Sequence, residues 1–71
     1  MSKIMKIRLL AMIDGELKQV VGMISNETVW MHGSANEEEC QIHCNNLADL
    51  EEFRALLLRM REQVVEEEFN V

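Results

Sequence analysis

Apolar residues occupy every odd position from Met5 to Ile13, whereas the even positions between them also hold charged residues. This alternation is typical of a β-strand that places one face on a core. The Asp14-Gly15 pair that follows is a common hairpin-turn sequence. Matching apolar positions across the turn favours a three-residue loop with a bulge at Gly15. The beginning of the chain therefore predicts a β-hairpin.

Two further strands are predicted after the hairpin, at residues 27–32 and 39–44. Residues 27–32 follow a Ser25-Asn26 turn and are rich in β-forming side chains. Residues 39–44 alternate again and follow a loop-like run that includes Gly33. Together with the hairpin, these segments predict a four-stranded antiparallel meander over residues 3–44.

The last third of the chain predicts one long helix, residues 47–67. Asn46 and Asp49 resemble a capping box at its start. Apolar residues then recur every three or four positions, as expected of a helix lying across a sheet. These residues are Leu50, Phe53, Leu57, Met60 and Val64. The predicted fold is α+β (ββββα), with residues 1–71 forming a single domain.

A chain of 71 residues builds only a small core, and domains of this size often need a metal, a disulfide or a partner subunit. The predicted helix is longer than the sheet and carries a second apolar line. This predicts a homodimer through Leu58, Val65 and Phe69, with Arg61 beside them. The alternative is a wider core stripe with a frayed tail.

The net charge of −6 is unevenly spread along the chain. Residues 1–20 hold four Lys or Arg against two acidic residues, and residues 21–71 hold three Arg against eleven acidic residues. Bulk attraction to nucleic acid or to an anionic membrane is therefore disfavoured. The acidic part favours a basic protein partner, or serves solubility alone.

No arrangement of residues predicts catalysis. On a strand, Cys40 and Cys44 point to the face opposite His43, which argues against a metal site and against a Cys-His nucleophile. The acidic triplets are typical of solvated surface. We therefore expect no enzyme activity, no metal and no cofactor. Because Cys40 and Cys44 lie too far apart on a strand for a disulfide and no signal peptide is recognisable, a cytoplasmic location is expected.

The predicted sheet has a second, outward face that is basic and holds the only Trp. Its candidate partner-binding residues are Trp30, Arg8, Lys6, Lys18, His32 and His43. A Trp among cations fits a protein interface, a base-stacking surface or simple packing. The predicted sheet followed by a long dimerising helix also resembles a family of single-stranded DNA-binding transcriptional coactivators. That resemblance implies a nucleic-acid-binding dimer, which is the alternative function.

The leading hypothesis is a small, acidic, non-enzymatic interaction protein that binds a macromolecular partner. In composition the chain resembles phage-encoded inhibitors of host or defence proteins, including nucleic-acid mimics whose carboxylates replace phosphates. The carboxylates that this resemblance implicates are Glu37, Glu38, Glu39, Asp49, Glu51 and Glu52.

Overall fold

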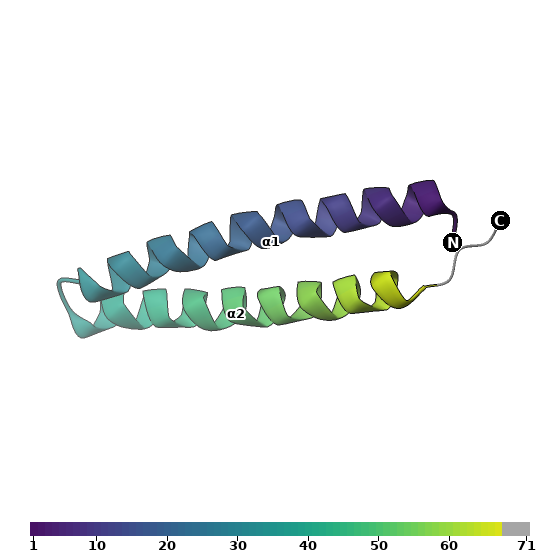
Figure 1. Ribbon diagram of the computed structural model, residues 1–71. Coiled ribbons are helices and arrows are strands. Elements are labelled where there is room, and N and C mark those ends of the chain that lie inside the picture. Colours follow the sequence, from purple (N-terminus) through teal and green to yellow (C-terminus); the bar gives the residue numbers. More distant parts are fainter. Residues whose placement is uncertain (68–71) are drawn as a thin grey trace.

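Two antiparallel α-helices account for the fold. The computed structural model describes residues 1–67, in which α1 (Lys3–His32) and α2 (Glu37–Glu66) are joined by a short loop and lie side by side (Figure 1). The hairpin measures 58 × 14 × 10 Å, and its radius of gyration is 16.4 Å, against roughly 11 Å for a compact domain of this length. The molecule is therefore a long rod with a loop end and an open end.

The predicted ββββα fold is wrong, because residues 1–67 contain no strand. The segments predicted as the sheet, residues 3–44, form all of α1 and the first turns of α2. The predicted helix, residues 47–67, corresponds to the later part of α2, which begins ten residues earlier than expected. The molecule is an all-helical hairpin.

A seven-residue repeat of apolar side chains explains why the first half of the chain is helical. Two series in α1 recur at this spacing and together form one stripe along the helix. The first series is Leu10, Leu17, Ile24 and Met31, and the second is Ile13 and Val20. An alternating pattern occurs within the same residues only because the intervening positions are also often apolar. The longer repeat prevails because a helix can bury it against a second helix.

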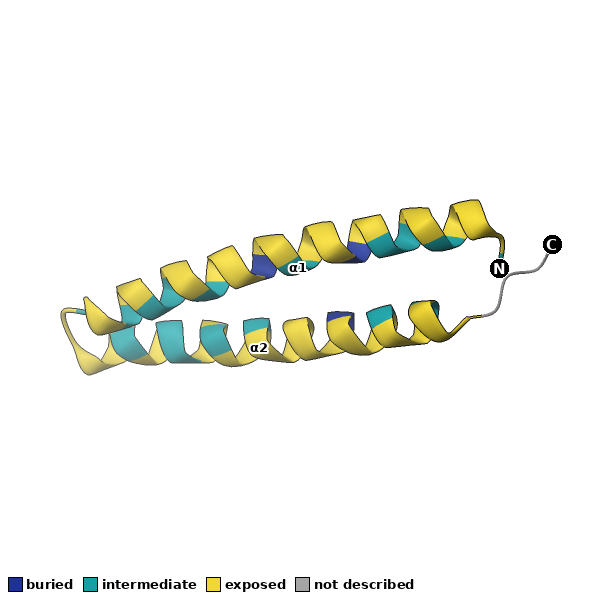
Figure 2. Ribbon diagram, in the orientation of Figure 1, coloured by how far each residue is buried: buried dark blue, intermediate teal, exposed yellow. Residues whose placement is uncertain are grey.

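The core is a narrow line between the two stripes. Ile13, Val20 and Leu57 are the buried residues of the described chain. Partly buried apolar residues extend the line on both helices: Leu17, Ile24, Leu50 and Val64. Figure 2 shows the buried and half-buried parts of each helix facing the other helix, whereas the outer sides are exposed.

The expected turn at Asp14-Gly15 does not form, and α1 continues through it. Neither Gly15 nor Gly22 has a positive φ, and a Cβ added to either one would meet nothing within 4 Å. Both glycines lie on the exposed side of α1. The helix tolerates them there because the stripe on its other side is continuous and no proline interrupts it.

The helix ends are capped by side chains close to the loop and the amino terminus. Ser2 Oγ accepts a hydrogen bond from the Met5 amide at 3.2 Å. Asn36 Oδ1 accepts one from the Glu39 amide at 2.8 Å, and Glu39 Oε2 accepts one from the Ala35 amide at 3.2 Å. The capping box is therefore at Asn36, and the predicted box at Asn46 and Asp49 is wrong because both residues lie inside α2.

Candidate functional site

A groove lies between the two helices on one side of the hairpin. Its volume is about 330 Å³. It is lined by Leu9, Met12, Ile13, Glu16, Leu57, Met60, Gln63 and Val64. The two buried core residues in this set form its floor, so the groove reaches the core of the hairpin from one side. It lies in the half of the molecule that contains the open end.

Residues spaced by seven from the groove lining share its side of the rod. A second hollow of about 290 Å³ follows the same spacing. Met23 in its lining lies seven residues after Glu16, and Asn46 lies fourteen residues before Met60. The other residues that line it are Glu27, Asp49 and Leu50. We name this side the groove flank. Its apolar residues are Met5, Leu9, Met12, Met23, Trp30, Ile42, Phe53, Leu56 and Met60.

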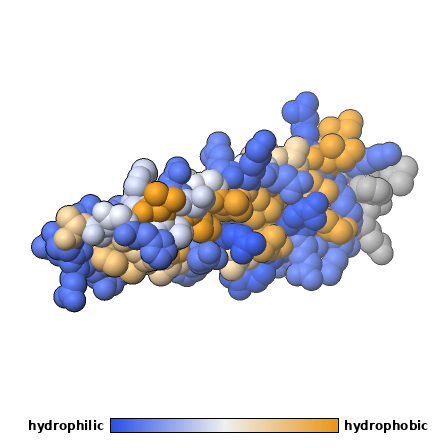
Figure 3. Space-filling view, turned by 60° about the vertical axis from the view of Figure 1, so that its left-hand side comes forward, coloured by the Kyte–Doolittle hydropathy of each residue, from blue (hydrophilic) through white to orange (hydrophobic). Residues whose placement is uncertain are grey.

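The groove flank leaves large apolar side chains in contact with solvent. Eight of its nine apolar residues are exposed, among them Met12 at 67% and Trp30 at 53%, and Leu9 is half-buried. Within residues 1–67, fourteen large apolar residues are exposed while three are buried. Figure 3 shows apolar residues at the surface, between hydrophilic ones, along much of the molecule. Such an excess of exposed over buried apolar area is typical of a protein that binds another macromolecule.

The opposite flank is apolar mainly near the open end. Its exposed apolar residues are Ile4, Ile7, Val21, Leu58 and Val65. It also carries the ion pair in which Arg61 Nε donates to Asp14 Oδ1 at 2.8 Å. Of the predicted dimer residues, Leu58 and Val65 lie on this flank, Arg61 is engaged with Asp14, and Phe69 lies outside the described residues.

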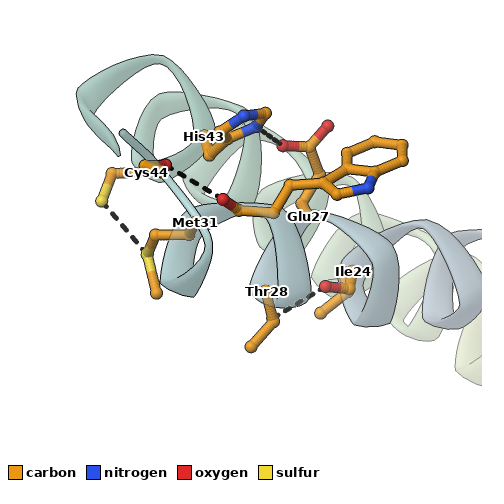
Figure 4. A network of polar contacts seen from close by, with 8 residues as sticks. Ile24, Glu27, Thr28, Met31, His43 and Cys44 are labelled. Carbon is orange, nitrogen blue, oxygen red and sulfur yellow. Dashed lines mark hydrogen bonds and ion pairs between the residues drawn. The ribbon is translucent and has the colours of Figure 1, made fainter. Parts of the chain in front are cut away.

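Near the loop, the core stripe becomes polar. His43 Nδ1 lies 2.6 Å from Glu27 Oε2, and the centroid of the Trp30 ring lies 6.0 Å from that of His43. On the same turn of α2, the Cys44 thiol donates to Met31 Sδ at 3.3 Å. Figure 4 shows His43 directed at Glu27 and Cys44 directed at Met31, so both contacts join α1 to α2.

The two cysteines are both free and half-buried, and they lie one turn apart on α2. Burial raises the pKa of the Cys40 thiol, and the neighbouring Cys44 and then Glu37 raise it further. A raised pKa leaves less thiolate at neutral pH, which disfavours a nucleophilic role for Cys40. Among residues 1–67, no three His, Cys, Asp or Glu side chains converge where a metal ion could be held.

Of the predicted basic and aromatic residues, the structure brings Trp30 and His43 together but separates Trp30 from the predicted lysines and arginine. These residues were expected to share one face of a sheet, and residues 1–67 contain no sheet. Trp30 lies 24 residues beyond Lys6 in α1, which is roughly 36 Å along the helix axis. Lys6 instead donates to the backbone oxygens of Val65 and Glu67 at 2.7 Å each, at the open end. Arg8, Lys18 and His32 are exposed at separate points along α1.

The predicted carboxylates are placed differently. All six of them are exposed, and all lie within the first sixteen residues of α2: Glu37, Glu38, Glu39, Asp49, Glu51 and Glu52. The sequence analysis did not identify the groove flank. The signal that could have indicated it is a seven-residue spacing, which links Glu16, Met23 and Trp30 in α1 and Phe53 and Met60 in α2.

Neither helix, within residues 1–67, is both long and apolar enough to cross a membrane. Comparison of the chain with protein-family models, with curated proteins and with solved structures gave no match.

Proposed function

We propose that this chain is a small acidic interaction protein that acts by binding another protein and not by catalysis. The observation that carries the proposal is the excess of exposed over buried apolar side chains within residues 1–67, where fourteen large apolar residues are exposed and three are buried. Enzymes hold their reacting groups in a concave, partly desolvated site. Here the groove between the helices is lined mostly by apolar side chains, with Glu16 as its one titratable group.

Charge indicates what kind of partner the surface fits. The loop half of the hairpin, residues 17–53, holds one cation, Lys18, against seven acidic residues. Glu27 is paired with His43, and the other six carboxylates are exposed on α2. A surface of this kind attracts a protein with a basic surface and repels nucleic acid. The proposed partner is therefore a protein with a basic surface, of the kind that otherwise contacts phosphates.

The alternative of single-stranded nucleic-acid binding loses its structural support. It required a sheet on which Trp30 and the cations of the first segment lie together, and these residues are spread along a helix. No feature of the hairpin replaces that surface, so we do not propose this function.

Charge reversal on α2 tests the proposed function. A tagged form of the protein is used to capture its partner from the native source, and the affinity of that partner is then measured at several salt concentrations. Glu38→Lys combined with Glu52→Lys reverses two exposed charges on α2. Glu62→Lys combined with Glu66→Lys is the matched control, with the same chemistry near the open end.

We expect the variant in the loop half to bind the partner at least about tenfold more weakly than the control does, with a smaller dependence on salt. Circular dichroism verifies that both variants keep their helices. Equal affinity for the two variants, or binding that does not weaken as salt rises, would contradict the proposal of a basic partner.

A further inference from the structure

The hairpin exposes more surface than a folded monomer of its size usually does. Its accessible surface is 5573 Å², whereas a compact protein of 8.3 kDa exposes roughly 4,600 Å². A standard interface buries roughly 800 Å² on each partner, which is close to the difference. One face of a rod of 58 by 14 Å has roughly that area as well. Burying one whole flank would therefore bring the exposed surface into the usual range.

The groove flank is the face with the most apolar surface to bury. It carries eight of the fourteen exposed large apolar residues, including both exposed aromatic side chains, Trp30 and Phe53. Its groove also leaves Ile13, Leu57 and Val64 accessible from this side. Four of its nine apolar residues are Met, whose flexible side chains adapt to an opposing helix. Helices that pack on this flank would extend the present core into a second layer.

Charge decides how a second copy would be oriented. The loop half holds one cation against seven acidic residues, whereas the open half, residues 1–16 and 54–67, holds six cations against five acidic residues. A parallel pair of hairpins would place two acidic loop halves side by side. An antiparallel pair places each acidic loop half beside the open half of the other copy, where Lys3 and Arg8 are exposed. Charge therefore favours the antiparallel pair.

We propose that two copies of this chain pair through their groove flanks, in antiparallel orientation, to form a four-helix bundle. Helix bundles of this kind bury seven-residue apolar stripes around one core. In a two-fold arrangement, Phe53, near the middle of α2, lies close to the axis. Met23 and Trp30 of one copy lie over the open half of the other copy, which contains the groove at Met12 and Met60. The opposite flank, with Leu58 and Val65, stays outside this dimer.

The oligomeric state tests the pairing and its face. Sedimentation equilibrium of the full chain should give twice the mass of one chain. Met12→Glu combined with Met60→Glu places charges in the groove and should weaken self-association at least about a hundredfold. Ile7→Glu combined with Leu58→Glu is the matched control, because both residues are exposed to a similar degree on the opposite flank and should leave the dimer intact.

A monomeric wild type, or a dimer that dissociates in the control variant and not in the groove variant, would overturn the proposal. A groove variant that loses its helices would not report on the interface, so the wild type supplies a second readout. Trp30 is the single Trp of the chain, and its emission should shift to longer wavelength when the wild type is diluted below the dimer's dissociation constant. An emission spectrum that is independent of concentration across the dissociation range contradicts the contact of Trp30.

The antiparallel orientation has its own test. Lys3 and Glu38 lie at opposite ends of a rod of 58 Å, so a direct amide link between them cannot form within one chain. A carbodiimide reagent, followed by peptide mapping of a mixture of ¹⁴N- and ¹⁵N-labelled chains, should give mixed-isotope links between Lys3 and the acidic residues at the start of α2. Links of Lys3 only to residues near its own end would contradict the antiparallel arrangement. This proposal shares the exposed apolar surface with the proposed function, but the two tests use different variants and readouts, so each can fail without the other.

Discussion

His43 and Glu27 form a polar contact of 2.6 Å at a place where both helices otherwise present apolar side chains to each other. Glu27 lies seven residues after Val20, and His43 lies seven residues before Leu50, so both continue the core stripes. Their side chains are only 14% and 17% exposed. A paired polar group inside such a stripe fixes the register of two helices, because any sliding would leave one partner buried and unpaired.

Removing one partner of this pair should cost stability, whereas removing both should not. Glu27→Ala leaves the His43 nitrogen without its partner, and we expect a loss of about 1–2 kcal/mol in the free energy of unfolding. Glu27→Leu combined with His43→Leu replaces the pair by an apolar contact and should be neutral or stabilising. Urea denaturation at one fixed protein concentration measures both effects. A double variant less stable than the single one would show that the pair stabilises the fold beyond satisfying its own polar groups.

The two glycines inside α1 weaken the helix and should be replaceable. Gly15→Ala and Gly22→Ala each add a Cβ into open space at a non-positive φ. We expect each substitution to raise the free energy of unfolding by about 0.5–1 kcal/mol, because alanine loses less backbone entropy in a helix.

Gly33→Ala is the control for the glycine substitutions, since Gly33 is the C-cap of α1 and its Cβ would lie 3.5 Å from the backbone oxygen of Val29. It should give a smaller gain than either of the other two. Thermal unfolding followed by circular dichroism gives the order. Destabilisation by Gly15→Ala or Gly22→Ala would mean that a surface recorded here as open is covered in solution.

The Asn36 side chain caps the amino-terminal end of α2 and should contribute to stability. Asn36→Ala removes the acceptor for the Glu39 amide and should lower the free energy of unfolding by about 1 kcal/mol. Asn36→Asp keeps an acceptor and should remain close to the wild type. Both are compared by urea denaturation. Equal losses for the two substitutions would show that the cap's hydrogen bond contributes nothing measurable.

The reactivity of Cys40 depends on pH in a direction set by its surroundings. Burial and the neighbouring Cys44 raise the pKa of the Cys40 thiol, so the folded chain holds its proton at a pH where the unfolded chain has lost it. The midpoint of Cys40 alkylation by iodoacetamide should therefore lie at higher pH in the folded protein than in a short unfolded peptide of the same sequence. By the same linkage, stability should fall as pH rises above the pKa of the unfolded thiol.

Cys44→Ser separates the causes of that shift. It removes the neighbouring thiol while leaving the burial of Cys40, so the alkylation midpoint should move only part of the way towards that of the peptide. A folded protein whose Cys40 reacts at lower pH than the peptide would reverse the sign of the prediction.

The later part of α2 was predictable from the sequence and α1 was not, for one physical reason. In the predicted helix the spacing of Leu50, Leu57 and Val64 admits only a helical interpretation, and these residues do pack on the core. In the first segment so many positions are apolar that period two and period seven fit the same residues. The Asp14-Gly15 pair then favoured a turn. The local sequence does not show that one helix continues through these two residues.

The candidate site was less predictable than the fold, because it follows from which residues the fold brings together. The six carboxylates could be singled out from composition alone, and all lie within the first sixteen residues of α2. The basic residues of the first segment were grouped by the sheet and separate in a helix. The groove requires both helices, since Met12 and Met60 meet only after residues 48 positions apart are paired.

The single loop orders how the chain can fold. The further a contact between the helices lies from that loop, the greater the sequence separation of the two residues that it joins. The separation is 16 residues for Glu27 and His43, 47 for Asp14 and Arg61, and 59 for Lys6 and Val65. Because the entropy of closing a chain segment rises with its length, the contact nearest the loop is the least costly to form first. We expect the two helices to zip from the contacts next to the loop, Cys44 with Met31 and then His43 with Glu27, towards the chain ends, with Lys6 and Val65 joining last.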